Sequence, residues 1–550
     1  MGQKKNSFER LIKLFKLEQS EIVAIYFYAI LSGLIQLTLP IGIQTIIGFS
    51  MGSTMVSSVY ILIFLVILGV LLVGLFQINQ MRIIEKIQQK IFVRYALEFA
   101  DVIPKFDSKV LDQYYLPEKI NRFFESLNVQ KGLFKLLLDI PTASIQILLG
   151  LMLLSLYHPF FIIFTIVLIL VVWLVFRLTS KKGFETSIVE SDCKYSVLAW
   201  LEEIGRVVKS LKNSQYTNLN IVKTDEKVLE YINSRTAHFN ILLLQFKSLI
   251  FFKVGITAII LILGTYLLFE QKLNIGEFVA AEIIILTVIN SLEKLIVSIE
   301  NIYDVMTGLY KLDSVIGNPL ESDGSIKLQS NELNIVMENM AFSYDNDIRL
   351  FEGVSCKISS GTITCISGNE DSGKSTFLKL LTGSYSDFQG SIRLNDIPIQ
   401  SYSLESLRGK TGVYFQEQDV FDGSLYENIT LGKTAIAIDD IMKMAKNIGI
   451  ESFILDFPNA FETIVNPWDK KLKKSTIKKI ILLRALVTDP QLLILEDPWY
   501  GLEDYKLNIQ NYLLKESKSK TIIVSSNEDD FIEKCNHHFL IDGLNVKINK

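Results

Sequence analysis

Cysteine is scarce in this chain, and the few that occur form no metal or disulfide pattern. The 550 residues include four cysteines, Cys193, Cys356, Cys365 and Cys535. No two of them are spaced as C-x-x-C, so the sequence argues against a zinc site and against a disulfide framework. We expect reduced thiols, as in proteins whose cysteines face the cytosol.

Net charge is also small, because 55 basic residues are offset by 59 acidic ones, which leaves −4. This balance gives no reason to expect nucleic acid or another strongly charged partner. Hydrophobic residues, in contrast, are abundant: they make up 49% of the chain and include 34 Phe and 21 Tyr. A soluble enzyme would rarely be this apolar.

The first twenty residues show no cleavable signal peptide. Phe8, Leu11, Ile12 and Phe15 recur at helical spacing with Lys and Arg between them. This pattern predicts an amphipathic N-terminal elbow helix over residues 1–20 that lies at a membrane surface. An ordinary capped helix remains the alternative.

The long apolar runs predict an all-α transmembrane domain of six helices over residues 21–315. Basic residues are concentrated in the long connections between spans 2 and 3 and between spans 4 and 5, and such residues mark the cytoplasmic side. We therefore predict an integral plasma (inner) membrane protein with six spans and both termini in the cytoplasm. The predicted spans, each long enough to cross about 30 Å of hydrocarbon, are approximately 21–49, 57–80, 138–157, 159–179, 246–269 and 276–298.

The two long connections predict helical extensions of the spans that turn back as hairpins in the cytoplasm. Their tips, residues 112–124 and 205–216, are placed to contact the soluble half of the chain, although a solvated helix face would have the same pattern. Within the spans, Pro40 predicts a kink. Lys253 and Glu293 fall at similar depth in spans 5 and 6, and we hypothesise that they pair.

A linker rich in Gly, Pro, Ser and Asp, residues 316–332, precedes an α/β domain over residues 333–550. There the strand "GTITCIS" runs into "GNEDSGKST" and then into a helix, which fits the phosphate-loop pattern G-x-x-x-x-G-K-S/T in its required setting. In such a loop backbone N–H groups surround the phosphates, Lys374 reaches the outer phosphates and Ser375 offers a hydroxyl to Mg²⁺. The predicted loop consists of Gly368, Asn369, Glu370, Asp371, Ser372, Gly373, Lys374, Ser375 and Thr376. The acidic Glu370 and Asp371 must point away from the phosphates.

Together, the six spans, the two long hairpins and the phosphate loop resemble an ATP-binding-cassette (ABC) exporter half-transporter of the type I fold, with a P-loop NTPase as its nucleotide-binding domain. "FSYDN" resembles the loop that stacks on adenine, which implies that Tyr344 is the stacking residue. "VYFQEQDVFDGSLYENI" resembles the segment that holds the Mg²⁺-contacting glutamine, which implies Gln416. "LLRALVTDPQLLILEDP" resembles the helix and strand that lead to an acidic pair. The resemblance implies ATP and Mg²⁺ as ligands.

The chain departs from this family at the positions that carry chemistry. The family's strand ends in Asp-Glu, but here Glu496 takes the metal position and Asp497 the general-base position. Asp497 is one methylene shorter, and a base that misses its water by about 1 Å can lose on the order of a hundredfold in rate. Asn527 stands where a histidine normally contacts the γ-phosphate.

The family's glycine-rich signature, LSGGQ, aligns with Leu472, Lys473, Lys474, Ser475 and Thr476. Both glycines are replaced, so side chains obstruct the close backbone approach to phosphate that glycine allows. The residues that hold nucleotide are kept and those that cleave it are altered. We therefore predict a domain that binds ATP and hydrolyses it slowly.

The family works as a dimer, so the predicted partners are a second half-transporter, as homodimer or heterodimer, the lipid bilayer and a transported substrate that the sequence does not identify. An alternative hypothesis is a regulatory or scaffold subunit that binds ATP without pumping, since ligand binding alone can shift a conformational equilibrium. A P-loop enzyme fused to an unrelated membrane anchor is a third.

Overall fold

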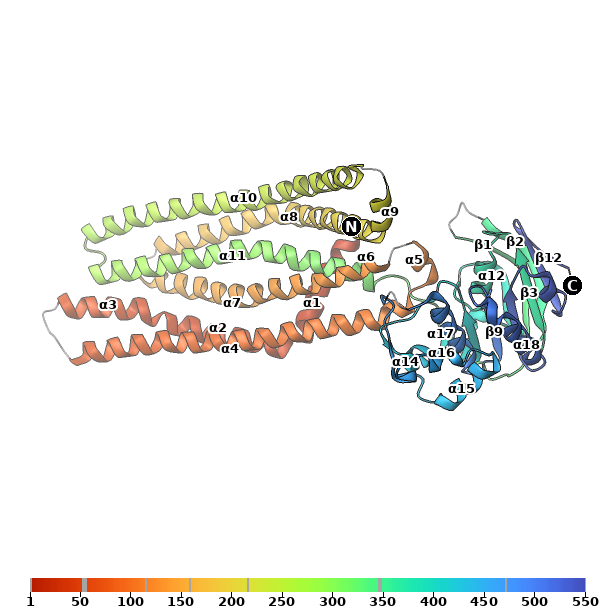
Figure 1. Ribbon diagram of the computed structural model, residues 1–550. Helices are drawn as coiled ribbons and strands as arrows, with labels where there is room; N and C mark the ends of the chain where they lie inside the picture. The colour runs from red at the N-terminus through yellow and green to blue at the C-terminus, as the bar shows by residue number, and fades with distance from the viewer. Residues whose placement is uncertain are drawn as a thin grey trace. The chain divides into compact units, whose positions relative to one another are not determined.

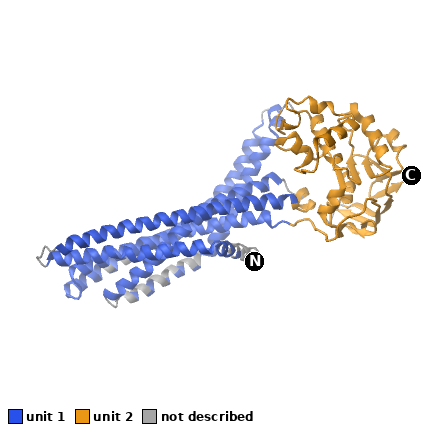
Figure 2. Cartoon of the chain, turned by 90° about the horizontal axis from the view of Figure 1, so that it is seen from below, with its two compact units in different colours: residues 1–104, 115–318 blue, residues 105–114, 319–550 orange. Residues whose placement is uncertain are grey.

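The computed structural model describes residues 2–51, 57–113, 116–157, 160–214, 217–344, 349–469 and 472–549. The chain divides into two compact units, coloured separately in Figure 2. Unit 1 comprises residues 1–104 and 115–318, and unit 2 comprises residues 105–114 and 319–550. The short segment 105–114 thus belongs to the C-terminal unit although it lies far from it in sequence.

Unit 1 is a bundle of long helices that lie side by side (Figure 1). The helices α4, α8 and α10 contain 46, 47 and 51 residues, and each continues well past its predicted span. At 1.5 Å per residue they are about 70 Å long, more than twice the hydrocarbon thickness. The predicted helical extensions are therefore present. The helices of this unit are α1 (Gly2–Leu17), α2 (Gln19–Gln36), α3 (Thr38–Met51), α4 (Ser57–Val102), α6 (Leu116–Ile120), α7 (Glu125–Tyr157), α8 (Phe160–Arg206), α9 (Val208–Asn213), α10 (Leu219–Phe269) and α11 (Ile275–Ile316), with 3₁₀ turns at Ile103–Lys105 and Asn121–Phe124.

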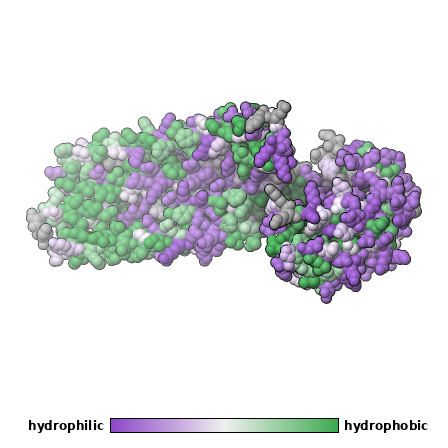
Figure 3. Space-filling model, viewed as in Figure 1, coloured by the Kyte–Doolittle hydropathy of each residue, from purple (hydrophilic) through white to green (hydrophobic). Residues whose placement is uncertain are grey.

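Five helical stretches among the described residues are long and apolar enough to cross a membrane, by length and composition. They are Gln19–Met51, Ser57–Lys105, Leu116–Tyr157, Leu219–Phe269 and Ile275–Ile316. The remaining predicted span, 159–179, falls largely on α8, and the number of spans and their orientation stay predictions. Figure 3 shows hydrophobic side chains covering the end of the bundle where α3 ends and α4 and α11 begin, and more hydrophilic ones toward the end that carries α9.

The predicted kink at Pro40 is confirmed as a break between α2 and α3. Leu37 separates the two helices, and Pro40 lies in the first turn of α3. Proline has no N–H to donate to the carbonyl four residues earlier, so the chain can begin a new helix there without losing a further bond. Thr38 Oγ1 donates to the Ile35 carbonyl across the break at 2.7 Å.

The predicted pair in spans 5 and 6 is also confirmed. Lys253 Nζ on α10 lies 3.2 Å from Glu293 Oε2 on α11. The predicted N-terminal helix is present as α1. Leu11 and Leu14 are buried and Ile12 is exposed, and its place at a membrane surface stays a prediction.

Unit 2 contains two larger sheets. Among the described residues, the central sheet has the strand order β12-β11-β3-β10-β9-β6, parallel except for β12, and an antiparallel sheet has the order β2-β1-β4-β5. The strands β3, β9 and β10 are almost wholly buried, which explains their unbroken apolar sequences.

The strands of unit 2 are β1 (Ile335–Ser343), β2 (Arg349–Ile358), β3 (Ile363–Gly368), β4 (Gln389–Leu394), β5 (Ile397–Pro398), β6 (Thr411–Tyr414), β7 (Gly423–Ser424), β8 (Ile464–Val465), β9 (Leu492–Glu496), β10 (Thr521–Ser525), β11 (His537–Asp542) and β12 (Asn545–Ile548). Its helices are α5 (Ser108–Gln113), α12 (Lys374–Leu381), α13 (Leu404–Lys410), α14 (Leu425–Thr430), α15 (Ile438–Asn447), α16 (Ser452–Leu455), α17 (Lys474–Leu486), α18 (Lys506–Glu516) and α19 (Asp529–Ile532).

Candidate functional site

The candidate site lies at the carboxyl edge of the central parallel sheet. The strands β3, β10, β9 and β6 are neighbours and run parallel, so the segments that follow them meet at one edge. These segments carry the phosphate loop after β3, Asn527 after β10, the acidic pair at the end of β9, and Gln416 after β6. Residues that are far apart in sequence are thereby collected in one place.

The phosphate loop has the backbone conformation that its glycines predict. Gly373 precedes α12 with φ of +95°, and an added Cβ would lie 3.0 Å from the Phe351 ring. Only glycine meets both conditions without strain. Asp371 also lies in the left-handed region, at φ of +60°, and both Glu370 and Asp371 are exposed, which leaves the concave side of the loop free of their carboxylates.

Lys374 is the first residue of α12 and folds over the loop. Its Nζ donates to the carbonyls of Gly368 and Asn369 at 2.9 and 2.7 Å. The Ser372 Oγ is buried and has no hydrogen-bond partner among the described residues. A loop with a lysine, an unpaired buried hydroxyl and a helix N-terminus at one place is suited to bind phosphate oxygens.

The residues at the end of β9 suit a magnesium ion. Ser375 Oγ donates to Glu496 Oε1, and the backbone N–H of Gln416 donates to Glu496 Oε2 at 2.9 Å. Magnesium is usually held by one or two carboxylates, with phosphate and water as the other ligands. One carboxylate beside a hydroxyl therefore fits. No cluster of three or more His, Cys, Asp or Glu that could hold a metal ion occurs among the described residues.

Gln416, rather than Gln418, meets the acidic pair. The Gln416 Nε2 donates to the carbonyls of Glu496 and Asp497 at 3.0 and 3.1 Å. The Oε1 of Gln418 instead accepts from the Phe415 N–H at 3.0 Å, which fixes that side chain within its own turn.

Asp497 is half-buried in the turn after β9. Its N–H donates to the carbonyl of Ser525 at 3.2 Å, and its φ of +41° is left-handed, which Asp tolerates better than most residues. Burial raises the pKa of the Asp497 carboxyl to about 6, Lys374 opposes that rise, and Glu496 adds to it. A carboxyl with this pKa is ionised at neutral pH and able to accept a proton near its titration range.

Asn527 contacts the phosphate loop itself. Its Oδ1 accepts from the Gly368 N–H and its Nδ2 donates to the Gly368 carbonyl, each at 3.0 Å. The exposed amide therefore makes a two-point bond to the first residue of the loop, which a histidine ring at this position could not reproduce.

Tyr344 lies beside the same loop. Its hydroxyl is 2.5 Å from the Thr376 hydroxyl, and its ring meets Phe342 edge-on at a centroid distance of 5.3 Å. Thr376 is buried, so this contact connects the end of β1 to the start of α12. The remainder of "FSYDN", Asp345 and Asn346, falls outside the described residues.

The signature-position segment, Leu472–Thr476, lies at the start of α17. Lys473 precedes this helix with an extended backbone and no side-chain capping bond, and Lys473 and Lys474 are both exposed. The segment thus presents a helix N-terminus with exposed, flexible lysines. This segment does not contact the phosphate loop of its own chain in any described hydrogen bond.

Tyr385 was not identified from the sequence, and it binds segment 105–114 to the rest of unit 2. The Tyr385 hydroxyl donates to Asp112 Oδ2 on α5 at 2.7 Å, and Phe106 is buried and bridges to Leu320. Tyr385 itself is fully buried and touches Tyr344 edge-on at 6.0 Å. Its partner is 273 residues away, so no local pattern could have identified it.

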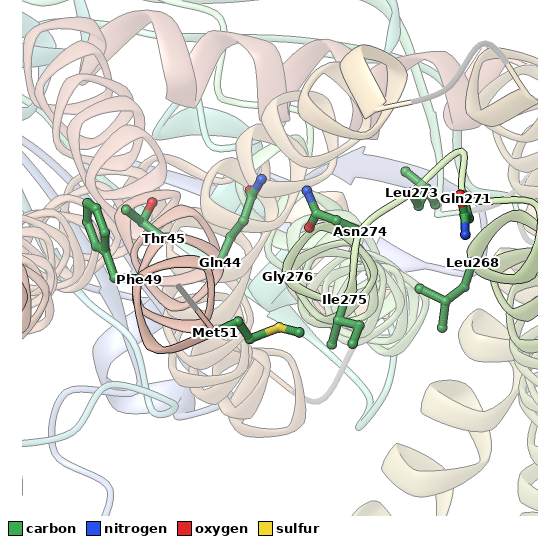
Figure 4. Close-up of a pocket in the computed structure, with 11 residues that line it drawn as sticks. Gln44, Thr45, Phe49, Met51, Leu268, Gln271, Leu273, Asn274, Ile275 and Gly276 are labelled. Atoms are coloured by element: carbon green, nitrogen blue, oxygen red, sulfur yellow. The ribbon is translucent and has the colours of Figure 1, made fainter. Parts of the chain in front are cut away.

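Unit 1 has a separate hollow of about 920 Å³ between α3 and the turn that joins α10 to α11 (Figure 4). Figure 4 shows the amides of Gln44 and Asn274 directed toward each other. Their oxygens are already engaged, since Gln44 Oε1 accepts from the Tyr157 hydroxyl and Asn274 Oδ1 caps α11. None of the described residues that line this cavity is charged.

Comparison with known proteins agrees with this geometry. The ABC transporter family model matches residues 351–500. Alpha-hemolysin translocation ATP-binding protein HlyB of Escherichia coli O157:H7 is 24% identical over 348 residues, which are 63% of this chain and 49% of that protein. ATP-dependent permease MDL2, mitochondrial, of Saccharomyces cerevisiae is 25% identical over 309 residues, 53% of this chain and 39% of that protein. The chain thus spans about half, or less, of these relatives.

The likeness in fold extends over nearly the whole chain. The structure of a bacterial Atm1-family ABC exporter with ATP bound matches with a TM-score of 0.85 and 17% sequence identity. The match covers 97% of this chain and 94% of that one. The helical bundle and the α/β unit therefore occur together in one established architecture.

Proposed function

We propose that this chain is one subunit of a membrane exporter, a half-transporter that binds ATP in its C-terminal unit and cleaves it slowly. The match of the ABC transporter family model to residues 351–500 and the likeness in fold to an ABC exporter support this proposal. The observation that supports this most directly is the convergence of Lys374, Ser375, Gln416 and Glu496 at one sheet edge.

In this proposal the loop N–H groups and Lys374 hold the phosphates, and Tyr344 stacks on adenine. Ser375, Gln416 and Glu496 hold Mg²⁺, which supplies charge neutralisation for the transferred phosphoryl group. Asn527 positions the loop through Gly368 rather than contacting the γ-phosphate.

Slow cleavage follows from the geometry around the attacking water. Asp497 occupies the general-base position with a side chain one methylene short, and the signature segment offers lysines in place of glycine backbone. Positioning and electrostatic stabilisation account for nearly all catalysis of phosphoryl transfer, so both losses act on the rate more than on binding.

Export requires that closure of the nucleotide-binding domains moves the bundle. We propose that segment 105–114, held by Tyr385, transmits this motion, because it continues directly from α4 in sequence. A second half-transporter supplies the other domain, as homodimer or heterodimer. ATP then drives the switch by binding the closed state more tightly than the open one.

The site is tested by nucleotide binding to the full chain in lipid nanodiscs. Lys374→Ala should abolish binding of a fluorescent ATP analogue, because the outer phosphates lose their cation. Lys357→Ala, an exposed lysine on β2, is the matched control and should bind as the parent does. Unchanged affinity in Lys374→Ala would show that the nucleotide binds elsewhere.

A further inference from the structure

A cavity of about 510 Å³ lies within unit 1, between α1, the first turns of α2 and interior turns of α7, α8 and α11. Figure 1 shows α1 running across the bundle rather than along it. The walls are apolar side chains of α1, α2, α7, α8 and α11, among them Leu11, Leu137, Phe184 and Met306. The volume falls within the roughly 300–1,000 Å³ typical of ligand pockets.

The residues that line the cavity lie at similar depth relative to the predicted membrane spans. Ile22 and Pro141 lie near the first residues of predicted spans 1 and 3, Lys181 follows the end of span 4, and Ile302 follows the end of span 6. All four positions are cytoplasmic ends of spans in the predicted topology. The cavity therefore straddles the level where acyl chains meet headgroups on the cytoplasmic side.

One charged residue borders this apolar space. Among the described side chains that line the cavity, Lys181 is the only charged one; it is exposed, and no described ion pair includes it. Nearby cations on α4 are neutralised, because Lys90 and Arg94 both bind the buried Glu18. Lys13 and Lys16 on α1 are also exposed.

We propose that this cavity binds an acyl chain of an anionic phospholipid from the cytoplasmic leaflet, with Lys181 at its headgroup. A soluble anion would leave the apolar walls facing water, and an uncharged lipid would leave the lysine without a counter-charge. Only an acidic amphiphile satisfies both parts of the site. The inference concerns unit 1 and does not depend on nucleotide binding in unit 2.

The test uses the full chain in detergent, titrated with dioleoyl phosphatidylglycerol or dioleoyl phosphatidylcholine, with retained lipid counted by native mass spectrometry. The parent should retain phosphatidylglycerol about fivefold more tightly, the size expected for one lysine at an anionic surface. Lys181→Gln should remove this preference. Lys182→Gln, which alters an adjacent exposed lysine outside the cavity, should keep it.

Met306→Trp, which fills the cavity, should lower retention of both lipids while thermal unfolding shows that the variant is folded. Equal losses in Lys181→Gln and Lys182→Gln would mean general surface attraction and overturn the proposal. Equal retention of the two lipids by the parent, or parental retention in folded Met306→Trp, would overturn it as well. If Met306→Trp does not fold, the two lysine variants decide.

Discussion

At the scale of single residues, Asp497 has the strongest influence on what the site can do. In the proposed site it is the base for the attacking water. It is half-buried, and the charge of Lys374 opposes the rise of its pKa. Burial raises that pKa to about 6, so a hydrolysis rate that depends on this carboxylate would be sensitive to mild acid.

We predict that ATP hydrolysis falls as pH decreases through about 6, because the protonated carboxyl cannot accept a proton. Folding stability should change in the opposite sense. The folded state holds this proton more tightly than the unfolded chain, whose Asp pKa is about 3.9, so this contribution is lost as pH rises through about 6. A rate profile between pH 5 and 8 checks the first point, and Asp497→Asn should remove that step from it.

We also predict that Asp497→Glu combined with Asn527→His raises the ATPase rate more than either change alone, by at least about tenfold over the parent. The longer carboxylate reaches the water and the imidazole reaches the outer phosphate. Each single variant should gain less, because Asn527→His gives up two bonds to Gly368 and Asp497→Glu lacks the phosphate contact. A double variant no faster than the parent would mean that these positions do not limit the rate.

At the scale of elements, an ion pair joins the two helices that follow the last long connection. Lys253 on α10 and Glu293 on α11 lie within spans, where unpaired charge is costly. We predict that Lys253→Ala and Glu293→Ala each destabilise the bundle, with a coupling of about 0.5–1.5 kcal/mol in a double-mutant cycle. Unfolding in mixed micelles supplies the free energies.

The matched control for this cycle is Lys247→Ala, an exposed lysine on α10. Its effect should add to that of Glu293→Ala with no coupling. Purely additive effects for Lys253 and Glu293 would contradict the pairing.

Helices, strands and turns were predictable where the evidence for them lay in neighbouring residues of the sequence. The buried runs that became β3 and β9, the glycines of the phosphate loop and the break near Pro40 all follow from neighbours in sequence. The Lys253–Glu293 pair was predictable because a short turn sets the two helices antiparallel, so depth can be counted.

Partners of contacts between distant segments were not predictable. The tip that begins at Asp112 was expected to meet the soluble half, but its partner Tyr385 was not predicted. The two bonds between Asn527 and Gly368 also depend on how separate elements pack. Likewise, the burial of Leu11 and Leu14 depends on which side α1 turns to the bundle. The spacing of apolar residues predicts a helix, but it does not predict which other helix or strand that helix packs against.

At the scale of the whole molecule, the fold combines helices long and apolar enough to cross a bilayer with a domain matched by the ABC transporter family model, for which we propose ATP as the ligand. If cleavage is slow, each nucleotide-binding domain keeps its ATP for a long time. The closed state, which binds ATP more tightly, is populated during that time. The chain would then act as a slow switch, and its turnover would be set by chemistry rather than by release of product.

The most direct test identifies the nucleotide that the protein retains. The full chain in nanodiscs, with any half-transporter that copurifies, is incubated with Mg²⁺ and ATP labelled on the α-phosphate, and the bound nucleotide is analysed over time. We predict retention that depends on Lys374 and label that stays mostly as ATP over many minutes. Absence of retained nucleotide, or conversion of the bound label to ADP within seconds, would contradict the account.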